Sequence, residues 1–238
     1  MKKAILQYAI QGKLVEQRPE EGTAEELYQK IQKEKQKLIK EGKIKKEKPL
    51  AEITEDEIPF DIPESWKWIR FGEIYNLTNG LASRGQAGNP PCPVLRLADL
   101  SNNLVNTENV RKLNISEKEK LTHLVQENDL ILIRVNGTRD RVGRAFLYKD
   151  KSPMSYCDHL FCGHALVSQI NVEYIQLIFN SYFNRQQLKS EIKTTAGQNT
   201  ISQESLKNVI LPLPPILEQA RIVEQINKML PCCDRLVK

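Results

Sequence analysis

The chain has 238 residues, of which 40% are hydrophobic and 27% charged, so it can bury one large core, or a medium core with helical extensions. It contains no apolar run of bilayer-spanning length and no long apolar segment after Met1, so we expect a cytoplasmic protein. Five cysteines, an odd number, argue against a disulfide framework, and the net charge of +5 permits binding to nucleic acid without requiring it.

A short helix is predicted at the amino terminus. Met1, Ile5, Tyr8 and Val15 recur three or four residues apart, as the apolar face of a helix does. Gly12 stands where a C-terminal glycine cap is expected.

A second helix is predicted between a capping box and a glycine. The hydroxyl of Thr23 can accept a hydrogen bond from the amide of Glu26, and Gly42 ends the pattern. Its thin apolar stripe predicts an exposed helix that leans on a neighbour. Residues 43–65 are rich first in lysine and then in glutamate, include three prolines, and predict an extended linker.

The centre of the chain predicts a mixed α/β domain. Trp66 and Trp68 open it, and we expect them to seat the linker on the domain edge rather than stack on bases. Residues 79–93, rich in glycine and proline, predict a long loop. Strands are predicted over 94–98, 129–135, 142–148 and 155–169, with helices over 116–121 and 172–193. A polar loop over 194–200, a short helix from Ile201 and a strand at Ile210 complete the domain.

A basic segment lies between two of these strands. From Arg134 to Lys151 the chain has six basic and two acidic residues, a local net charge of +4. The dipeptide Asn136-Gly137 is a strong hairpin signal, so we expect a turn that projects Thr138, Arg139 and Arg141 outward. Arginines are favoured at base and phosphate contacts, although most charge runs are only solvated faces.

The last predicted element is a helix with a narrow apolar stripe. Prolines 212, 214 and 215 hold its entry extended. The stripe comprises Ile216, Ala220, Val223, Ile226, Leu230, Cys233 and Val237. A stripe this narrow is typical of a seam between helices, so it requires a partner. If Lys238 were followed by Met1, the apolar series would continue in phase, which suggests half of a larger unit or one completed by a second copy.

Two segments resemble a catalytic or a metal-binding motif. Asn89-Pro90-Pro91 matches the start of an adenine methyltransferase signature, but Cys92 replaces the aromatic residue, and no glycine-rich strand-to-helix turn precedes it. The segment from Cys157 to His164 holds two cysteines and two histidines, which suggests zinc. In a strand these side chains point to opposite faces in pairs, so we expect no metal site.

No other catalytic constellation is evident. The sequence shows no Ser/His/Asp order, paired carboxylates or phosphate loop, and the acidic residues of the central domain are scattered. We therefore expect a non-catalytic chain without a cofactor of its own.

Several conserved-looking segments resemble type I restriction–modification specificity subunits. They are Ile5–Leu14, Glu57–Trp68, Val94–Leu100, the Pro-Leu-Pro-Pro-Ile-Leu-Glu-Gln-Ala-Arg-Ile-Val run over 212–223, and Leu230–Leu236. Together they span essentially the whole chain. Members of that family usually carry two recognition domains and two long helices, whereas this chain has one domain and two helical pieces, so it resembles a half-length form.

The resemblance implies an α+β fold in which one target-recognition domain is flanked by helices that form an antiparallel coiled-coil spacer. The expected divisions are a helical region over 1–48, a linker over 49–65, the recognition domain over 66–210 and the spacer helix over 211–238. The implied partners are double-stranded DNA, modification subunits that methylate adenine, and a restriction subunit. S-adenosylmethionine, ATP and Mg²⁺ would belong to those subunits, and the chain would direct them to a bipartite target.

The candidate DNA contacts are chosen from loop position and side-chain chemistry, because arginine suits guanine and Asn or Gln suits adenine. They are Arg84, Gln86, Asn136, Thr138, Arg139, Arg141, His159, Thr195, Gln198 and Asn199. The candidate partner or dimer helix residues are Ile5, Tyr8, Val223, Ile226, Leu230 and Cys233.

Two copies related by a twofold axis would rebuild the two-domain architecture and read a split, palindromic target. Two alternatives stay open. One is an assembly fragment that binds modification subunits without reading DNA, and the other is an adenine methyltransferase that relies on the segment 89–92.

Overall fold

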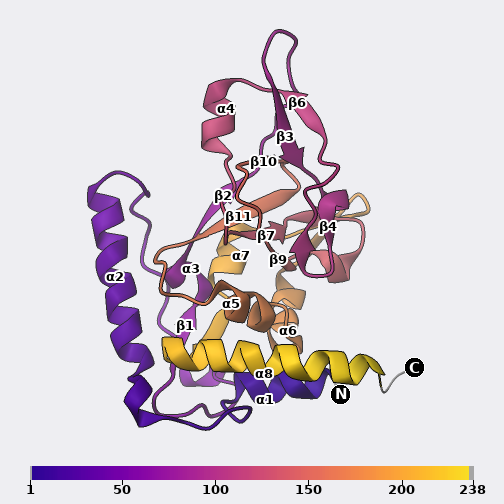
Figure 1. Ribbon diagram of the computed structural model, residues 1–238. Helices are drawn as coiled ribbons and strands as arrows, with labels where there is room; N and C mark the ends of the chain where they lie inside the picture. The colour runs from indigo at the N-terminus through magenta and orange to yellow at the C-terminus, as the bar shows by residue number, and fades with distance from the viewer. Residues whose placement is uncertain (1, 236–238) are drawn as a thin grey trace. The chain divides into compact units, whose positions relative to one another are not determined.

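The computed structural model describes residues 2–235, which form two compact units (Figure 1). The helical unit comprises residues 2–74, 166–187 and 207–235, and the sheet unit comprises residues 75–165 and 188–206. The fold is mixed α/β with several sheets. Among the described residues, no helix is both long and apolar enough to cross a membrane.

The helical unit contains most of the helices and one strand pair. Its elements are α1 (Lys2–Ile10), α2 (Ala24–Lys40), β1 (Lys67–Arg70), α3 (Phe71–Ile74), α5 (Val172–Phe179), β14 (Ile210–Leu213), α8 (Ile216–Arg235) and the 3₁₀ turns Pro19–Glu21 and Glu55–Glu57. Two helices, α6 (Tyr182–Glu191) and α7 (Gln203–Lys207), have residues in both units. Residues 66–74 and 166–187, which the sequence places in the central domain, thus pack with the terminal helices.

The two amino-terminal helices form as predicted. Gly12 adopts a φ of +68° after α1, and its amide donates to the carbonyl of Ala9. Thr23 Oγ1 accepts from the amide of Glu26 at 3.3 Å, and Gly42, with a φ of +69°, follows α2. The capping chemistry that the sequence carries therefore sets the end of α1 and both ends of α2.

The apolar stripe of α8 is rotated from the predicted one. Val223, Ile226 and Cys233 are buried as expected, but Ala220 is exposed and Ile222 is fully buried. Helices α1 and α5 contact α8, and α1 runs alongside it in Figure 1. The partner that the seam requires is therefore supplied, at least in part, by the chain itself. The predicted stripe residue Val237 lies outside the described residues.

The sheet unit is built on a six-stranded sheet with the order β2-β11-β7-β9-β5-β4. Its strands are β2 (Tyr75–Asn79), β11 (Leu160–Ala165), β7 (Leu130–Ile133), β9 (Ala145–Leu147), β5 (Leu104–Val105) and β4 (Leu100–Ser101). A second sheet has the order β10-β3-β6, with β10 (Ser155–Tyr156), β3 (Pro91–Leu95) and β6 (Lys112–Asn114), and a third the order β12-β13-β8, with β12 (Lys193–Thr195), β13 (Gln198–Thr200) and β8 (Val135–Asn136). Helix α4 (Glu117–Thr122) and the 3₁₀ turns Leu97–Asp99 and Arg139–Arg141 lie between strands.

The sheet unit contains a large apolar core cluster and a smaller one. The larger cluster includes Ile131 and Ile133 of β7 and Leu160 and Cys162 of β11. These side chains pack with Tyr156 of β10. The near-unbroken apolar runs of β7 and β11 fit strands covered on both faces.

Three predictions about the central part of the chain were wrong. Asn136 and Gly137 do not form a hairpin turn, because neither has a positive φ and Asn136 instead lies in β8, paired with β13. Residues 194–200 are not a loop but most of the hairpin β12–β13. The helix predicted over 172–193 is broken at Asn180, where α5 ends.

The two tryptophans have the structural role that the sequence predicts. Trp66 Nε1 donates to the buried carboxylate of Glu218 at 2.8 Å. The ring of Trp68 packs edge-on against that of Phe60 in the linker, with centroids 5.3 Å apart. Both therefore fasten the segment before β1 to the helical unit.

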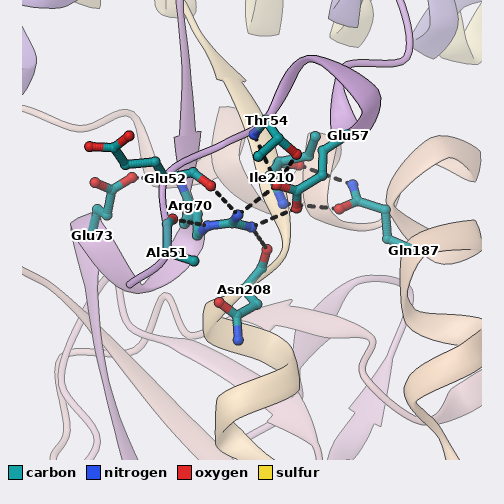
Figure 2. A network of polar contacts seen from close by, with 9 residues as sticks. All are labelled: Ala51, Glu52, Thr54, Glu57, Arg70, Glu73, Gln187, Asn208 and Ile210. Carbon is teal, nitrogen blue, oxygen red and sulfur yellow. Dashed lines mark hydrogen bonds and ion pairs between the residues drawn. The ribbon is translucent and has the colours of Figure 1, made fainter. Parts of the chain in front are cut away.

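A buried guanidinium fastens the linker to the β1–β14 pair (Figure 2). Arg70, whose side chain is 5% exposed, donates from Nε to the carbonyl of Ala51 and from Nη2 to that of Glu52. Its Nη1 donates to the carbonyl of Asn208, and both terminal nitrogens contact the carboxylate of Glu57 at 3.1 and 2.8 Å. All five N–H groups of Arg70 thus have an acceptor, which a buried arginine requires.

We predict that Arg70→Met lowers the unfolding free energy of the helical unit by about 3 kcal/mol, because it leaves buried carbonyls without their donor. Urea unfolding followed by tryptophan fluorescence measures this, since Trp66 and Trp68 both lie in that unit. The matched control is Lys228→Met, which breaks an exposed pair with Glu224 and should change stability by less than about 1 kcal/mol. Equal losses in the two variants would contradict the assignment.

Glu218 makes stability depend on pH. Burial raises the pKa of its carboxyl above the ordinary value of 4.5, although hydrogen bonds from Trp66 and Gln17 oppose this shift. A group whose pKa is raised in the folded state stabilises the protein below the unfolded pKa and loses that stability as pH rises through the folded pKa. The unfolding free energy of the wild type minus that of Glu218→Gln should therefore fall as pH rises from the ordinary pKa of 4.5 through the raised pKa of the folded state. A difference that is flat or rises with pH would show that the pKa is not raised.

Candidate nucleic-acid interface

One end of the six-stranded sheet gathers several of the predicted contact residues. Strand register places Asn79 opposite Phe161, Leu160 opposite Ile133, and Leu132 opposite Ala145. The strands β2 and β7 therefore end where β11 and β9 begin. The segments 80–90, 134–144 and 157–159 consequently leave the sheet at the same end, which we call the loop end.

A glycine allows two of these segments to touch. A Cβ on Gly80 would lie 1.9 Å from the carbonyl oxygen of Cys157, a distance that no side chain tolerates. With glycine there, the amide of Leu81 donates to the backbone carbonyl of Tyr156 at 2.7 Å. The amide of Asp158 donates to the backbone carbonyl of Leu81 at 3.0 Å. The loop after β2 is thereby held against the segment that precedes β11.

The held segments bring Arg84 and His159 to one carboxylate. Nη1 and Nη2 of Arg84 donate to the two oxygens of Asp158, each at 3.2 Å, and His159 Nδ1 lies 3.0 Å from Asp158 Oδ1. Burial raises the pKa of Asp158, but the Arg84 guanidinium and His159 outweigh it and leave the pKa below its ordinary value. Asp158 is therefore a carboxylate at neutral pH, and Arg84 remains 65% exposed beside it.

A pocket of about 260 Å³ opens beside this cluster. Its lining residues are Ser83, Arg84, Val94, Arg96, Leu97, Ala98, Arg111, Leu113, Cys157, Asp158 and His159. Apolar side chains thus form part of the wall, and three arginines contribute the positive groups.

The hairpin β12–β13 adds a polar ribbon to the same unit. Ala196 and Gly197 at its tip have φ values of +48° and +76°, as a two-residue type I′ turn requires. Thr195 and Gln198 are paired across the turn, and both are exposed. The sequence signal was the glycine after Ala196, but the polar composition suggested a loop instead.

Three predicted contact residues hold this hairpin in place. Asn199 is 7% exposed, and its amide donates to the carbonyls of Asn136 and Gly137. Arg139 donates to Thr194 Oγ1 and to the carbonyls of Lys189 and Ile192. The Asn136 side chain accepts from the amide of Thr138. These contacts assign structural roles to Asn136, Arg139 and Asn199.

The remaining predicted residues are more accessible. Gln86 and Thr138 are exposed, and Arg141 is half-buried with one donor on the carbonyl of Leu100. The loop end thus brings together Arg84 and His159, and the hairpin carries Thr195 and Gln198. Sequence reasoning missed Arg96 and Arg111, because neither lies in a predicted loop or turn.

A family model described as the type I restriction modification DNA specificity domain matches residues 63–236. The chain belongs to this family. The resemblance that the sequence suggested is thereby confirmed. Specificity subunits are non-catalytic, which supports the expectation that the chain is not an enzyme.

Relatives align over nearly the whole chain. The EcoEI specificity subunit of Escherichia coli is 32% identical over 99% of this chain and 41% of its own length. The EcoAI specificity subunit of the same species is 31% identical over 99% of this chain and 40% of its own length. The chain therefore spans about two fifths of the length of these specificity subunits.

Solved structures share the fold. The HsdS subunit from Thermoanaerobacter tengcongensis superposes with a TM-score of 0.53 at 21% identity, over 75% of this chain and 41% of that one. A chain from a structure on complex assembly and conformational transition of the type I R-M system gives 0.54 at 18% identity, over 89% and 48%. At these identities the likeness concerns the fold alone.

Within this specificity-family chain, one cysteine–histidine group is structural. Ligand atoms of Asp129, Cys162 and His164 lie within 4.8 Å of one another. His164 Nδ1 is 2.9 Å from Asp129 Oδ1, and its Nε2 is 3.3 Å from Thr78 Oγ1. Burial raises the pKa of the Cys162 thiol well above its ordinary value, which disfavours the thiolate that a metal needs. Hydrogen bonds account for this group.

Residues 89–92 make packing and hydrogen-bond contacts within the sheet unit. Cys92 is 5% exposed within an apolar cluster, and the carbonyl of Pro90 accepts from the amide of Ile115. In the methyltransferase signature that carbonyl would bind the target amino group. The geometry thus disfavours the methyltransferase alternative.

Four of the six predicted helix residues are buried within the chain. They are Ile5, Val223, Ile226 and Cys233. Tyr8 is 55% exposed, and Leu230 is half-buried. Tyr8 therefore offers the largest accessible apolar surface in this predicted set.

We predict that Gly80→Ala destabilises the sheet unit by about 1–3 kcal/mol, because backbone must move to remove the clash with Cys157. The control is Gly137→Ala, where an added Cβ has nothing within 4 Å and φ is not positive. Amide hydrogen exchange across residues 80–90 and 157–159 measures the effect locally. Unchanged protection in Gly80→Ala would contradict the close approach.

Proposed function

We propose that this chain is the DNA-reading part of a type I restriction–modification system. Family membership supports the specificity role, and the loop end with the β12–β13 hairpin supplies the surface. In this proposal the chain directs modification and restriction subunits to a bipartite target and works in the cytoplasm. S-adenosylmethionine, ATP and Mg²⁺ would be bound by those partners.

The observation that carries this proposal is the exposed two-stranded ribbon. The major groove of B-DNA admits a two-stranded β-ribbon, whose side chains then meet base edges. The ribbon presents Thr195 and Gln198 outward and has Lys193 at its base. Gln198 offers the amide that pairs with adenine, and Lys193 offers a charge for phosphate.

The structural contacts behind the ribbon support this use. Base readout needs side chains held within a narrow range of positions. Asn199 and Arg139 tie both ribbon strands to β8 and to the end of α6 within the sheet unit. Polar residues at this site therefore have two roles in this proposal: Asn199 and Arg139 fix the ribbon through contacts within the chain, and Thr195 and Gln198 contact DNA.

Selection from random duplexes, followed by sequencing at near-physiological salt, tests the proposal. It should recover a defined motif. We predict that Gln198→Ala then weakens binding to that motif by about 1–3 kcal/mol and changes nonspecific binding little. Lys193→Ala should weaken both and reduce the salt slope by about one.

The matched control is Gln126→Ala, because Gln126 is also exposed but precedes β7 at the opposite end of the sheet. It should leave both affinities unchanged. Selection that recovers no motif would favour the assembly fragment, which binds modification subunits without reading DNA. Equal losses of affinity for Gln198→Ala on all sequences would show that Gln198 contacts the DNA backbone and not a base.

We further propose that two copies pair through their terminal helices and so present two recognition units. Family membership motivates this pairing, because the chain spans about two fifths of its relatives' length. In this proposal α1 and α8 of each copy contribute to an antiparallel coiled-coil spacer, with Tyr8 at the contact.

We predict a dimer by light scattering at about 10–100 µM, within the affinity range of specific interfaces. Tyr8→Arg should shift it to monomer, since a charge replaces buried apolar surface. Leu121→Arg serves as the control, because Leu121 is 71% exposed on α4 in the other unit. A strictly monomeric wild type would contradict the pairing.

A further inference from the structure

The pocket beside Asp158 has the size and lining of a small-ligand site. Its volume of about 260 Å³ lies just below the usual range for drug-sized ligands. Val94, Leu97, Ala98 and Leu113 supply apolar wall, on which a flat ring can pack. All of its lining residues belong to the sheet unit and lie near the loop end.

The charged groups of the pocket favour an anion. Arg111 is exposed, and its guanidinium makes no hydrogen bond or ion pair among the described residues. Nε and Nη2 of Arg96 donate to the carboxylate of Asp99, and Nη2 also donates to the carbonyl of Asn109. Nη1 of Arg96 makes no hydrogen bond among the described residues. Asp158 is the one acidic residue of the lining, and Arg84 neutralises it. Two guanidiniums thus remain for a phosphate, which arginine binds well.

Asp158 also has one acceptor position left. A carboxylate offers about four lone-pair sites. Oδ1 takes Nη1 of Arg84 and the Nδ1 side of His159, whereas Oδ2 takes only Nη2 of Arg84. The side chain is 26% exposed, so Oδ2 can accept from a ligand N–H group. An exocyclic amino group is such a donor. Thymine has none, and its N3–H group lies between two carbonyl oxygens, which the carboxylate of Asp158 repels.

We propose that this pocket holds one base unstacked from the DNA, with the base against the apolar wall, its amino group on Asp158 and its phosphate on Arg96 and Arg111. This inference rests on the proposed function for the source of the nucleotide. Unstacking a base costs a few kcal/mol, which ring burial and charge-assisted hydrogen bonds offset. Adenine, cytosine and guanine satisfy Asp158, so the pocket adds selectivity against thymine at one position of the target.

Calorimetric titration with mononucleotides tests the pocket without a known target. The wild type should bind dCMP or dAMP at least about tenfold more tightly than dTMP, because the N3–H group of thymine approaches Asp158 only together with two carbonyl oxygens that the carboxylate repels. Asp158→Asn should remove this preference, and Leu97→Trp should abolish binding by filling the pocket. Glu127→Gln, on an exposed residue at the opposite end of the sheet, is the control and should bind like the wild type.

Two results would overturn the proposal. Inorganic phosphate that competes as well as dCMP would show an anion site only, and the absence of mononucleotide binding at millimolar concentration would show no nucleotide site. Circular dichroism of Leu97→Trp confirms that it folds. If that variant does not fold, dTMP that binds as tightly as dCMP to the wild type still counts against the proposal.

Duplex DNA then distinguishes this inference from the proposed function. In the selected motif, 2-aminopurine placed in turn at each adenine and directly beside each other base should brighten where one base has left the stack with the wild type and not with Leu97→Trp. A selected motif whose 2-aminopurine never brightens would remove the extrahelical base and leave sequence recognition intact. Failure to select any motif would instead remove the proposed function.

Discussion

The buried guanidinium of Arg70 is the contact on which the architecture depends. It joins the linker at Ala51 and Glu52 to Asn208, where the chain has returned from the sheet unit. The pairing of β1 with β14 runs beside it, so the last strand before the sheet unit and the first after it are neighbours. The two segments of the sheet unit, residues 75–165 and 188–206, lie between these two strands in the sequence.

Polar residues at the proposed DNA surface divide by burial rather than by type. Asn199 and Gln198 are neighbours in sequence on β13, yet the first is buried and bonded to Gly137 while the second faces solvent. The period of two in a strand produces this alternation. Because the buried side chains fix the backbone, the exposed ones can be held for base contacts. The same logic applies to Asp158, whose contact with Arg84 positions both groups at the pocket.

Local signals in the sequence predicted the end of α1 and both ends of α2 well, because a cap such as Thr23 depends on residues three positions away. They failed where tertiary pairing decided the outcome. Asn136 and Gly137 carry a hairpin signal, but pairing of β8 with β13 holds Asn136 in a strand. The hairpin at Ala196 was missed because its residues are polar. Among the candidate contact residues, Arg84 and His159 meet at Asp158. The hydrogen bonds of Arg139 could not be predicted from the sequence, because its acceptors on Lys189 and Ile192 lie about fifty positions away along the chain.

The central claim is that the loop end and its ribbon face DNA, and ultraviolet cross-linking to selected duplexes with peptide mass spectrometry tests it most directly. If the loop end and the ribbon face DNA, we expect cross-links within residues 80–90, 134–141, 157–159 and 193–200. Few cross-links are expected within the segment around Gln126 at the opposite end of the sheet. Cross-links concentrated on α2, or around Gln126, would contradict it, because DNA would then bind a surface that the ribbon does not form.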